Sequence, residues 1–290
     1  MQQSEMYDNS AYWQQLHKQF SGKLRAVGFP WLSEAFNELK YKSEASSLVP
    51  VLGEIGTAFA GSKSLSVLEV GAGTGYWTRF VAGYFKEHSF SVQSTALDIS
   101  EDALKGIHAL FPECSVVRAD LKSIDISDVD LKYDIVLSFY CLHHLVSIDE
   151  FLNALKFVAR SVKPGGFLLI MDPILTRPFS TFHAIDFVSW KGNGVPRPRH
   201  IIDDVLQKEG FERVSFGPAV SFVLNGNLES QGSISFRFHR MVWSSLSIIY
   251  RSSALTKLFS GTLVLVDRLL KRMNRAFSSS LLVSKRKSTN

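Results

Sequence analysis

The 290-residue sequence has only two cysteines and no long run of apolar residues. Cys114 and Cys141 are too few for a disulfide framework, and each lies in an apolar segment, as is typical of a small buried side chain in a reducing, intracellular compartment. Because no stretch of about 18 apolar residues occurs, we predict no membrane-spanning helix. The start, MQQSEMYDNS, also lacks the charged and then apolar layout of a signal peptide, so we expect a cytoplasmic location.

Acidic residues are scarce toward the C-terminus. From Arg237 onward the sequence has eleven lysines and arginines but one acidic residue, Asp267, a balance of +10. The whole chain carries a net charge of +5, so the first 236 residues carry −5. A basic segment of this kind can face a membrane surface, an anionic substrate or nucleic acid, or it can be an ordinary solvated surface.

Helical periodicity dominates the first 60 residues. Apolar residues recur at spacings of three and four: Tyr12, Leu16 and Phe20 share a face in AYWQQLHKQF, and the pattern continues through WLSEAFNELKYK and SSLVPVLGEIGTAF. We therefore assign residues 1–60 to an N-terminal helical cap.

Predicted strands and helices alternate from residue 61 to residue 225. The strands are SLSVLEVGAG, FSVQSTALDIS, CSVVRADL, KYDIVLSFY and GGFLLIMDP, and amphipathic segments such as TGYWTRFVAGYFKEH lie between them. This alternation favours parallel strands joined by right-handed crossovers, and runs as apolar as LLIMD are typical of strands buried on both faces. We predict a doubly wound, Rossmann-like α/β core.

The pattern loosens after Pro173. Residues 173–200 are rich in Pro, Gly and Arg without a clean period, which indicates a long loop or lid, and a helix and a strand follow in HIIDDVLQKEGFERVSF. We interpret residues 226–276 as a helical lid or insertion, and residues 277–290 as a final strand with a basic tail.

Three glycines at alternate positions follow the first strand, in VLEVGAGTGYWTRF (residues 67–80). Such a loop places close backbone and helix N–H groups at the carboxyl end of the strand, where doubly wound sheets bind ligands. No Gly-Lys-Ser/Thr follows, which excludes a phosphate loop of the Walker type, and Tyr76 stands where the dinucleotide fingerprint has Gly or Ala. Glu69 would repel a pyrophosphate but suits a ligand that carries an amino group and a sulfonium.

Two further acidic residues end the next two strands. Asp98, in ALDIS, follows Gly75 by 23 residues, roughly the separation expected of a carboxylate that accepts ribose hydroxyls. Asp120, in RADL, is placed to meet an exocyclic amine, and Leu121 to cover a base. Each acid alone could be a strand-end cap, but acids at three successive strand ends favour cofactor roles.

The segments VLEVGAGTG, ALDIS, RADL, YDIVLSFYCLHHL and VKPGGFLLIMDP resemble the successive motifs of class I S-adenosylmethionine-dependent methyltransferases. The order and spacing match across residues 65–173, and the flanking segments resemble those of a narrower bacterial group within this class. The resemblance implies a seven-stranded sheet whose last strand is antiparallel. It also implies S-adenosyl-L-methionine as the cofactor.

The resemblance further implies a set of cofactor contacts at the strand ends: Glu69, Gly71, Ala72 and Gly73 in and before the glycine loop, Asp98 and Ile99 at the ribose, Asp120 and Leu121 at the adenine, and Phe139 and Tyr140 at the junction with the substrate. Trp13, in the N-terminal helix, could fold over the cofactor or simply pack the helix.

Two adjacent histidines, His143 and His144, follow the fourth strand. Methylation of a hydroxyl needs a base near neutral pH, and histidine suits that role. The pair could equally serve packing or cofactor contact, and of the two we favour His144 as the base. Neighbouring histidines alone do not make a metal site, so we expect no metal.

Several basic residues of the loop region are candidates for substrate binding: Arg177, His183, Arg197 and Arg199. The VPRPR segment holds two guanidinium groups on a stiff backbone, which suits a substrate carboxylate or phosphate. An ordinary solvated loop is the alternative.

The basic, apolar segment at residues 237–275 has two interpretations. It could lie in a membrane interface with its basic residues at the headgroups, or it could pack on the sheet as a substrate lid, which is the use of extra helices in the resembling family. Its basic residues are dispersed among Leu, Ile and Val, so we expect no nucleic-acid partner. The oligomeric state stays open.

The sequence thus predicts an S-adenosylmethionine-dependent methyltransferase. It would transfer the methyl group to an oxygen atom of a small-molecule acceptor such as a sugar, a lipid-linked glycan or a secondary metabolite. A non-catalytic S-adenosylmethionine-binding or membrane-associated accessory protein is the alternative. A NAD-dependent oxidoreductase is a third interpretation, which Glu69 and Tyr76 disfavour.

Overall fold

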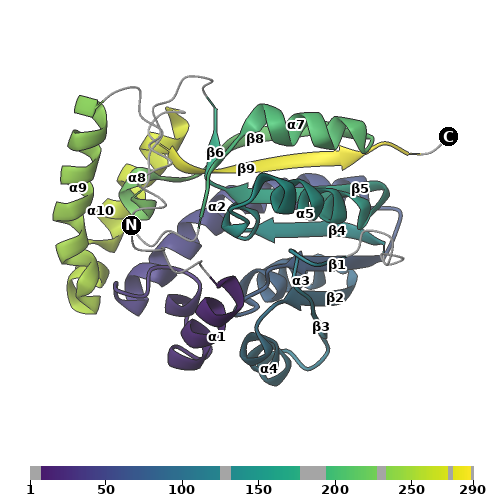
Figure 1. Cartoon of the computed structure of the whole chain (residues 1–290), viewed down its shortest axis with the longest axis horizontal. Helices are drawn as coiled ribbons and strands as arrows, with labels where there is room; N and C mark the ends of the chain where they lie inside the picture. The colour runs from purple at the N-terminus through teal and green to yellow at the C-terminus, as the bar shows by residue number, and fades with distance from the viewer. Residues whose placement is uncertain (1–7, 125–131, 177–193, 227–232, 274–276, 289–290) are drawn as a thin grey trace, which may run out of the picture.

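The computed structural model describes residues 8–124, 132–176, 194–226, 233–273 and 277–288. A seven-stranded sheet of order β3-β2-β1-β4-β5-β9-β8 forms its centre (Figure 1). The strands are β1 (Ser64–Val70), β2 (Ser91–Asp98), β3 (Ser115–Arg118), β4 (Tyr133–Phe139), β5 (Val162–Asp172), β8 (Phe211–Ser221) and β9 (Phe277–Arg286). A short pair, β6 (Ile174–Leu175) and β7 (Arg197–Pro198), lies outside this sheet.

Strands β1 to β5 are parallel, whereas β9 runs antiparallel to both β5 and β8, between which it lies. The opposite directions of the β4 and β9 arrows are visible in Figure 1. The predicted doubly wound sheet with an antiparallel last strand is therefore confirmed. The parallel strands end at one edge of the sheet, so residues that follow them are brought together there.

The helices flank this sheet or extend it. They are α1 (Asn9–Gln19), η1 (Leu24–Ala26), α2 (Glu34–Ala58), α3 (Tyr76–Glu87), α4 (Glu101–Leu110), η3 (Leu142–His144), α5 (Ile148–Arg160), α7 (Arg199–Lys208), α8 (Phe222–Asn225), α9 (Ser233–Arg251) and α10 (Ser253–Arg272).

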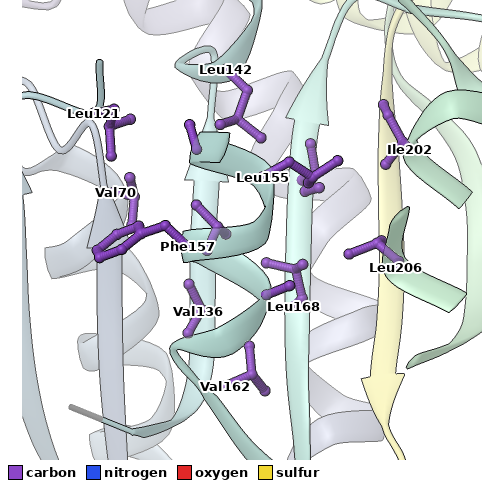
Figure 2. Packing of buried hydrophobic residues seen from close by; sticks show 14 of the residues in the cluster. Val70, Leu121, Val136, Leu142, Leu155, Phe157, Val162, Leu168, Ile202 and Leu206 are labelled. Atoms are coloured by element: carbon purple, nitrogen blue, oxygen red, sulfur yellow. The ribbon is translucent and has the colours of Figure 1, made fainter. Parts of the chain in front are cut away.

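Apolar layers cover both faces of the sheet. Figure 2 shows one of them, in which Leu155 of α5 and Leu206 of α7 lie over Val136 of β4 and Leu168 of β5. Helices α2 and α3 pack on the opposite face with the alternate strand residues, among them Ile135. Side chains of a strand point alternately to the two faces, so the continuously apolar strands supply both layers.

The longest helix, α2, is continuous over 25 residues and includes Pro50. The side chain of Pro50 is exposed, and the helix buries Leu48 and Leu52 against the sheet. The two helical segments predicted from WLSEAFNELKYK and SSLVPVLGEIGTAF are thus one element. Because α2 runs behind the sheet edge where the parallel strands end, it can place side chains near the strand-end residues.

Helices α9 and α10 follow α8 in the chain. Together they pack against α2, α8 and β8. A buried acid, Asp267, holds α10 in place: it accepts a hydrogen bond from the Ser221 amide at 2.8 Å and from the Ser43 hydroxyl, and it pairs with Lys271 at 3.1 Å. Among the helices of the described ranges, none combines the length and the apolar content that crossing a membrane requires.

Candidate active site

A pocket opens where β1, β2, β3 and β4 end, beneath α1. The pocket volume, including the solvent-filled mouth, is about 810 Å³, which is a common size for a small-molecule site. All eleven predicted cofactor contacts line it: Trp13, Glu69, Gly71, Ala72, Gly73, Asp98, Ile99, Asp120, Leu121, Phe139 and Tyr140.

The glycine loop fits tightly between β1 and α3. Gly71 has φ of +75°, and a Cβ there would lie 2.7 Å from the Cβ of Cys141 and still closer to its sulfur. Gly73 has φ of +54°, and a Cβ there would overlap a methyl group of Val27. Both positions therefore require glycine for backbone conformation and for space.

The amides of this loop are already used within the fold. Gly71 and Ala72 donate to the carbonyl of Leu97 at 2.8 and 3.0 Å, and Gly73 donates to Oδ2 of Asp98 at 2.8 Å. An anion site would need such N–H groups directed at the ligand. The loop is thus closed to a pyrophosphate at these three positions, which argues against a dinucleotide.

Glu69 lies in the pocket wall with 1% of its surface exposed. Its Oε2 accepts hydrogen bonds from the Thr78 amide at 2.7 Å and from the Thr78 hydroxyl. Burial nevertheless raises the pKa of Glu69 to about 8, and the nearby charge of Asp98 adds to the rise. A cationic group in the pocket would favour the ionised form, so this carboxyl suits a cationic ligand.

Asp98 ends β2 with both carboxylate oxygens held by backbone. Oδ1 accepts from the Ser100 amide and Oδ2 from the Gly73 amide, each at 2.8 Å. Burial raises the pKa of Asp98, while these bonds and the nearby His17 oppose the rise. The fixed carboxylate keeps further lone pairs that a ligand hydroxyl can reach.

Helix α1 turns one face toward the pocket, with Asn9, Trp13 and His17 in the lining. These residues are four apart, which places them on one side of a helix. Only Trp13 is among the residues predicted from sequence, although the spacing of four was visible there. Burial lowers the pKa of His17, opposed by the charges of Asp98 and Asp102.

The two histidines after β4 occupy different environments. His144 lines the pocket, and its ring is edge-on to Trp13 at 4.8 Å. His143 lies behind it, buried, with Nδ1 at 2.7 Å from Oδ1 of Asp172. Burial lowers the pKa of His143 to about 3 and raises that of Asp172 to about 8, so both groups favour their neutral forms. His143 is therefore a poor proton acceptor.

Tyr140 brings a buried charged pair to the pocket. Its backbone has φ of +54°, and its hydroxyl donates to Oε1 of Glu44 and lies 2.6 Å from Oγ of Ser279. Lys40 pairs with the same Oε1 at 2.6 Å and lies 4.0 Å from the centre of the Tyr140 ring. We call Lys40, Glu44, Tyr140 and Ser279 the Tyr140 network.

The charges of the Tyr140 network are fully enclosed, since Lys40 is 2% exposed and Glu44 is 0% exposed. Burial lowers the pKa of Lys40 and raises that of Glu44, and their pairing opposes both shifts. Burial raises the pKa of Tyr140 most, and the charge of Glu44 raises it further. The phenol therefore stays protonated and acts as a donor. The sequence signal for this network is an i,i+4 charge pair on the otherwise apolar side of α2.

Comparison with known proteins identifies a domain in this chain. Residues 67–166 match a family model described as a methyltransferase domain. The chain is 27% identical over 107 residues to the "Probable S-adenosylmethionine-dependent methyltransferase Rv3030" of Mycobacterium tuberculosis, covering 37% of this chain and 35% of that protein.

Residues 67–166 form a methyltransferase domain, and the predicted resemblance to S-adenosylmethionine-dependent methyltransferases is confirmed.

Two more similar proteins show how far the similarity extends. The chain is 26% identical over 175 residues to the O-methyltransferase resE of Aspergillus sclerotiorum, covering 56% of this chain and 61% of that protein. A candidate sarcosine dimethylglycine methyltransferase from Galdieria sulphuraria has a similar fold, with a TM-score of 0.53, 17% identity, and coverage of 84% and 85% of the two chains. The methyltransferase spans less than two thirds of the length of either curated relative.

The cofactor of this family, S-adenosyl-L-methionine, carries a sulfonium and an amino group. The pocket fits such a cation for two reasons. Glu69 is a buried carboxyl whose pKa is raised to about 8, and a bound cation would favour its ionised form. The amides of Gly71, Ala72 and Gly73 are bonded to Leu97 and Asp98, so they do not form an anion site. The apolar side chains of Leu121 and Trp13 offer surfaces for a base.

The two described candidates for substrate contact do not line the methyltransferase pocket. Arg197 donates to the carbonyls of Leu145 and Val146 at 2.7 and 2.8 Å, so it closes the turn after η3. Arg199 lies 3.5 Å from Asp203 in α7 and over the ring of Phe216. These contacts give both guanidinium groups roles within the fold.

The remaining candidates, Arg177 and His183, lie outside the described residues, as does most of the predicted loop. No side chain of α9 or α10 is among the lining residues, so in the described structure α1, and not the C-terminal helices, covers this pocket.

Proposed function

We propose that the protein transfers the methyl group of S-adenosyl-L-methionine to an oxygen atom of a small-molecule acceptor, such as a sugar, a lipid-linked glycan or a secondary metabolite. The observation that carries the proposal is the pocket in which Glu69, Asp98, Asp120 and Tyr140 converge from four strand ends. The similarity to an O-methyltransferase over 56% of the chain supports oxygen as the methylated atom.

In this proposal each strand-end residue contacts a different part of the cofactor. Glu69 faces the amino and sulfonium charges, because a buried carboxyl gains most from a cation. Asp98 accepts the ribose hydroxyls, since its orientation is fixed by two backbone amides. Asp120 accepts the adenine amine, Leu121 covers the base, and Trp13 closes the pocket from above.

The acceptor lies on the side of Tyr140 and His144 in this proposal. Methyl transfer is a displacement at carbon: the bond from sulfur to the methyl carbon breaks as the bond from acceptor oxygen forms. The acceptor proton passes to His144, the histidine that lines the pocket. The protein contributes alignment of the two reactants and exclusion of water.

Label transfer tests the proposal. Purified protein is incubated with methyl-labelled S-adenosyl-L-methionine and cell lysate, and the products are divided into organic, aqueous and protein fractions. We expect label in the organic or aqueous fraction, and none above background with Asp98→Ala. Label confined to the protein fraction would contradict a small-molecule acceptor. Cofactor binding without any transfer would favour a non-catalytic accessory protein.

The role of His144 has its own test once an acceptor is known. We expect His144→Gln to lower kcat by about 100-fold and to leave the affinity for S-adenosyl-L-methionine within about twofold of the wild type. Asp149→Asn, an exposed change in the first turn of α5, is the control that should leave the rate unchanged. A rate within about twofold of the wild type for His144→Gln would assign the base elsewhere.

A further inference from the structure

Helix α9 carries a second apolar stripe besides the one that packs on the protein. Ile234, Phe238, Met241 and Ile248 are exposed, and Ile234 is 83% exposed. Their spacings of four, three and seven place them along one side of the helix. Single exposed apolar residues are ordinary, but a stripe that runs the length of a 19-residue helix marks an interaction surface.

Helix α10 repeats this arrangement. Its exposed apolar residues again follow helical spacing and one of them, Leu258, is 73% exposed; they are Leu255, Leu258, Phe259, Leu265, Val266, Leu269 and Met273. The stripe therefore extends from the start of the helix to its end, over 20 residues.

Neither stripe is needed to hold these helices on the fold. Tyr250 of α9 is fully buried against Phe36 of α2, with ring centroids 4.3 Å apart, and its hydroxyl donates to the Val223 carbonyl at 2.7 Å. Leu263 and Asp267 of α10 are buried on the side that faces the domain. The exposed stripes are thus additional apolar surface.

Basic residues lie beside each stripe. In α9 they are Arg237, Arg240 and Arg251, and in α10 they are Lys257, Arg268 and Arg272. Separations of three or four and of eleven residues keep each set on one side of its helix, because eleven residues complete about three turns. The one acidic residue of the two helices, Asp267, is buried and paired with Lys271, so their exposed side-chain charge is entirely positive.

We propose that the α9–α10 surface, formed by these stripes and the basic residues beside them, docks on a lipid surface that carries negative charge. The apolar side chains would enter the boundary between headgroups and acyl chains, and the basic residues would meet the headgroups. In Figure 1, α9 forms the outer margin of the molecule, where a flat surface can reach it. This docking does not depend on the proposed methyl transfer.

Charge favours lipid over the other possible occupants. A symmetric contact with a second copy of the chain would bring the same basic strips together, and like charges across an interface oppose association. Nucleic acid would match the charge but would leave the exposed Ile, Leu and Met stripes without apolar partners.

Vesicle co-sedimentation of the full chain tests the proposal. We expect binding to vesicles of phosphatidylcholine with 30% phosphatidylglycerol, weaker binding to pure phosphatidylcholine, and partial release in high salt. Arg237→Gln with Arg251→Gln should weaken binding to the anionic vesicles by about 30-fold, because each basic residue near the surface contributes about fivefold. Ile248→Ser with Leu258→Ser should weaken it by at least about tenfold.

Matched controls change exposed residues elsewhere on the molecule. Lys105→Gln with Lys208→Gln removes two charges from α4 and α7, and Leu110→Ser with Val214→Ser removes two exposed apolar side chains from α4 and β8.

Both controls should bind as the wild type does. Equal loss in a control and its matched variant, or no pelleting with anionic vesicles, would overturn the proposal. A lipid-free dimer that Ile248→Ser with Leu258→Ser dissociates would assign the surface to a second copy. Retained S-adenosyl-L-methionine affinity in all variants would show that the fold is intact.

Discussion

The strand-end acids lie in the pocket wall and the Lys40–Glu44 pair lies behind Tyr140 of the same wall, but their partners come from different distances along the chain. Glu69 is bonded to Thr78, nine residues away, and Asp98 to Ser100, two residues away. Asp98 is also bonded to the Gly73 amide, 25 residues away in the glycine loop. Glu44, by contrast, is bonded to Tyr140, 96 residues away. The strand-end acids are therefore oriented by the segments that follow β1 and β2, whereas the network exists only when α2, β4 and β9 are assembled.

This difference predicts different consequences of mutation. Changes at the strand ends should reduce cofactor affinity and leave most of the stability, because the local backbone still forms. Changes at Lys40 or Glu44, which do not line the pocket, should reduce stability and spare cofactor affinity, because they leave a buried charge unpaired. The predictions below test this contrast.

Glu44→Gln should have the largest effect on stability. It leaves Lys40 buried without a countercharge, which costs about 3–5 kcal/mol in comparable buried pairs. We expect urea denaturation to show a loss of this order in the free energy of unfolding. Affinity for S-adenosyl-L-methionine, measured by calorimetry below the unfolding transition, should change by less than about threefold.

Adding Lys40→Met to Glu44→Gln supplies the control. The double variant removes the orphaned charge, so it should recover much of the lost stability. If the single and double variants unfold at the same urea concentration, the unpaired charge of Lys40 is not the cause of the loss.

Gly71→Ala should have the largest effect on binding. The added Cβ would collide with Cys141 in a backbone conformation that alanine avoids, so the loop must move. We expect at least about 100-fold weaker cofactor binding, equivalent to roughly 2.7 kcal/mol. Gly83→Ala, in α3 with no atom near its Cβ, should bind normally. Normal binding by Gly71→Ala would show that the loop does not shape the cofactor site.

Asp98→Asn should weaken cofactor binding by about 10- to 100-fold. The change keeps the shape of the side chain but removes the charge that strengthens hydrogen bonds to hydroxyls, worth about 1.5–3 kcal/mol. Asp102→Asn removes an exposed acid four residues away and should bind within about twofold of the wild type. Equal losses in both variants would point to long-range charge in place of direct contact.

Most of the fold, and the convergence of the predicted cofactor contacts on one pocket, could be predicted from the sequence. Alternating strands and helices specify the doubly wound sheet, and the ends of parallel strands must meet at one edge. Asp98 ends β2 and Asp120 lies two residues after β3, so their positions in the pocket depend on little beyond that topology.

The rest of the site depends on packing between distant segments. Asn9 and His17 reach the pocket only because α1 folds over it, and no local pattern states which strand end a preceding helix will cover. His143 and His144 are adjacent in sequence, yet only His144 lines the pocket, because His143 turns toward Asp172. Arg197 looked available for substrate, but nearby carbonyls bind it.

The prediction for Glu69 concerns the pH dependence of stability, not the affinity of a variant. Its pKa is about 8 in the folded protein, against an ordinary value of 4.5, so between these values the folded state holds a proton that the unfolded state has lost. The free energy of unfolding should therefore fall as pH rises from about 5 to 8, by up to about 1.4 kcal/mol per pH unit from this group. Asp172, also near 8, acts in the same direction.

Glu69→Gln separates this contribution from that of Asp172. The variant lacks the titrating group, so its stability should fall less steeply with pH than that of the wild type. Saturating S-adenosyl-L-methionine should flatten the wild-type slope, because a bound cation favours the carboxylate and returns its pKa toward the ordinary value, and it should leave the slope of the variant unchanged. Identical slopes with and without cofactor in the wild type would mean that no cationic group binds beside Glu69, and the local half of the pocket would then need another ligand.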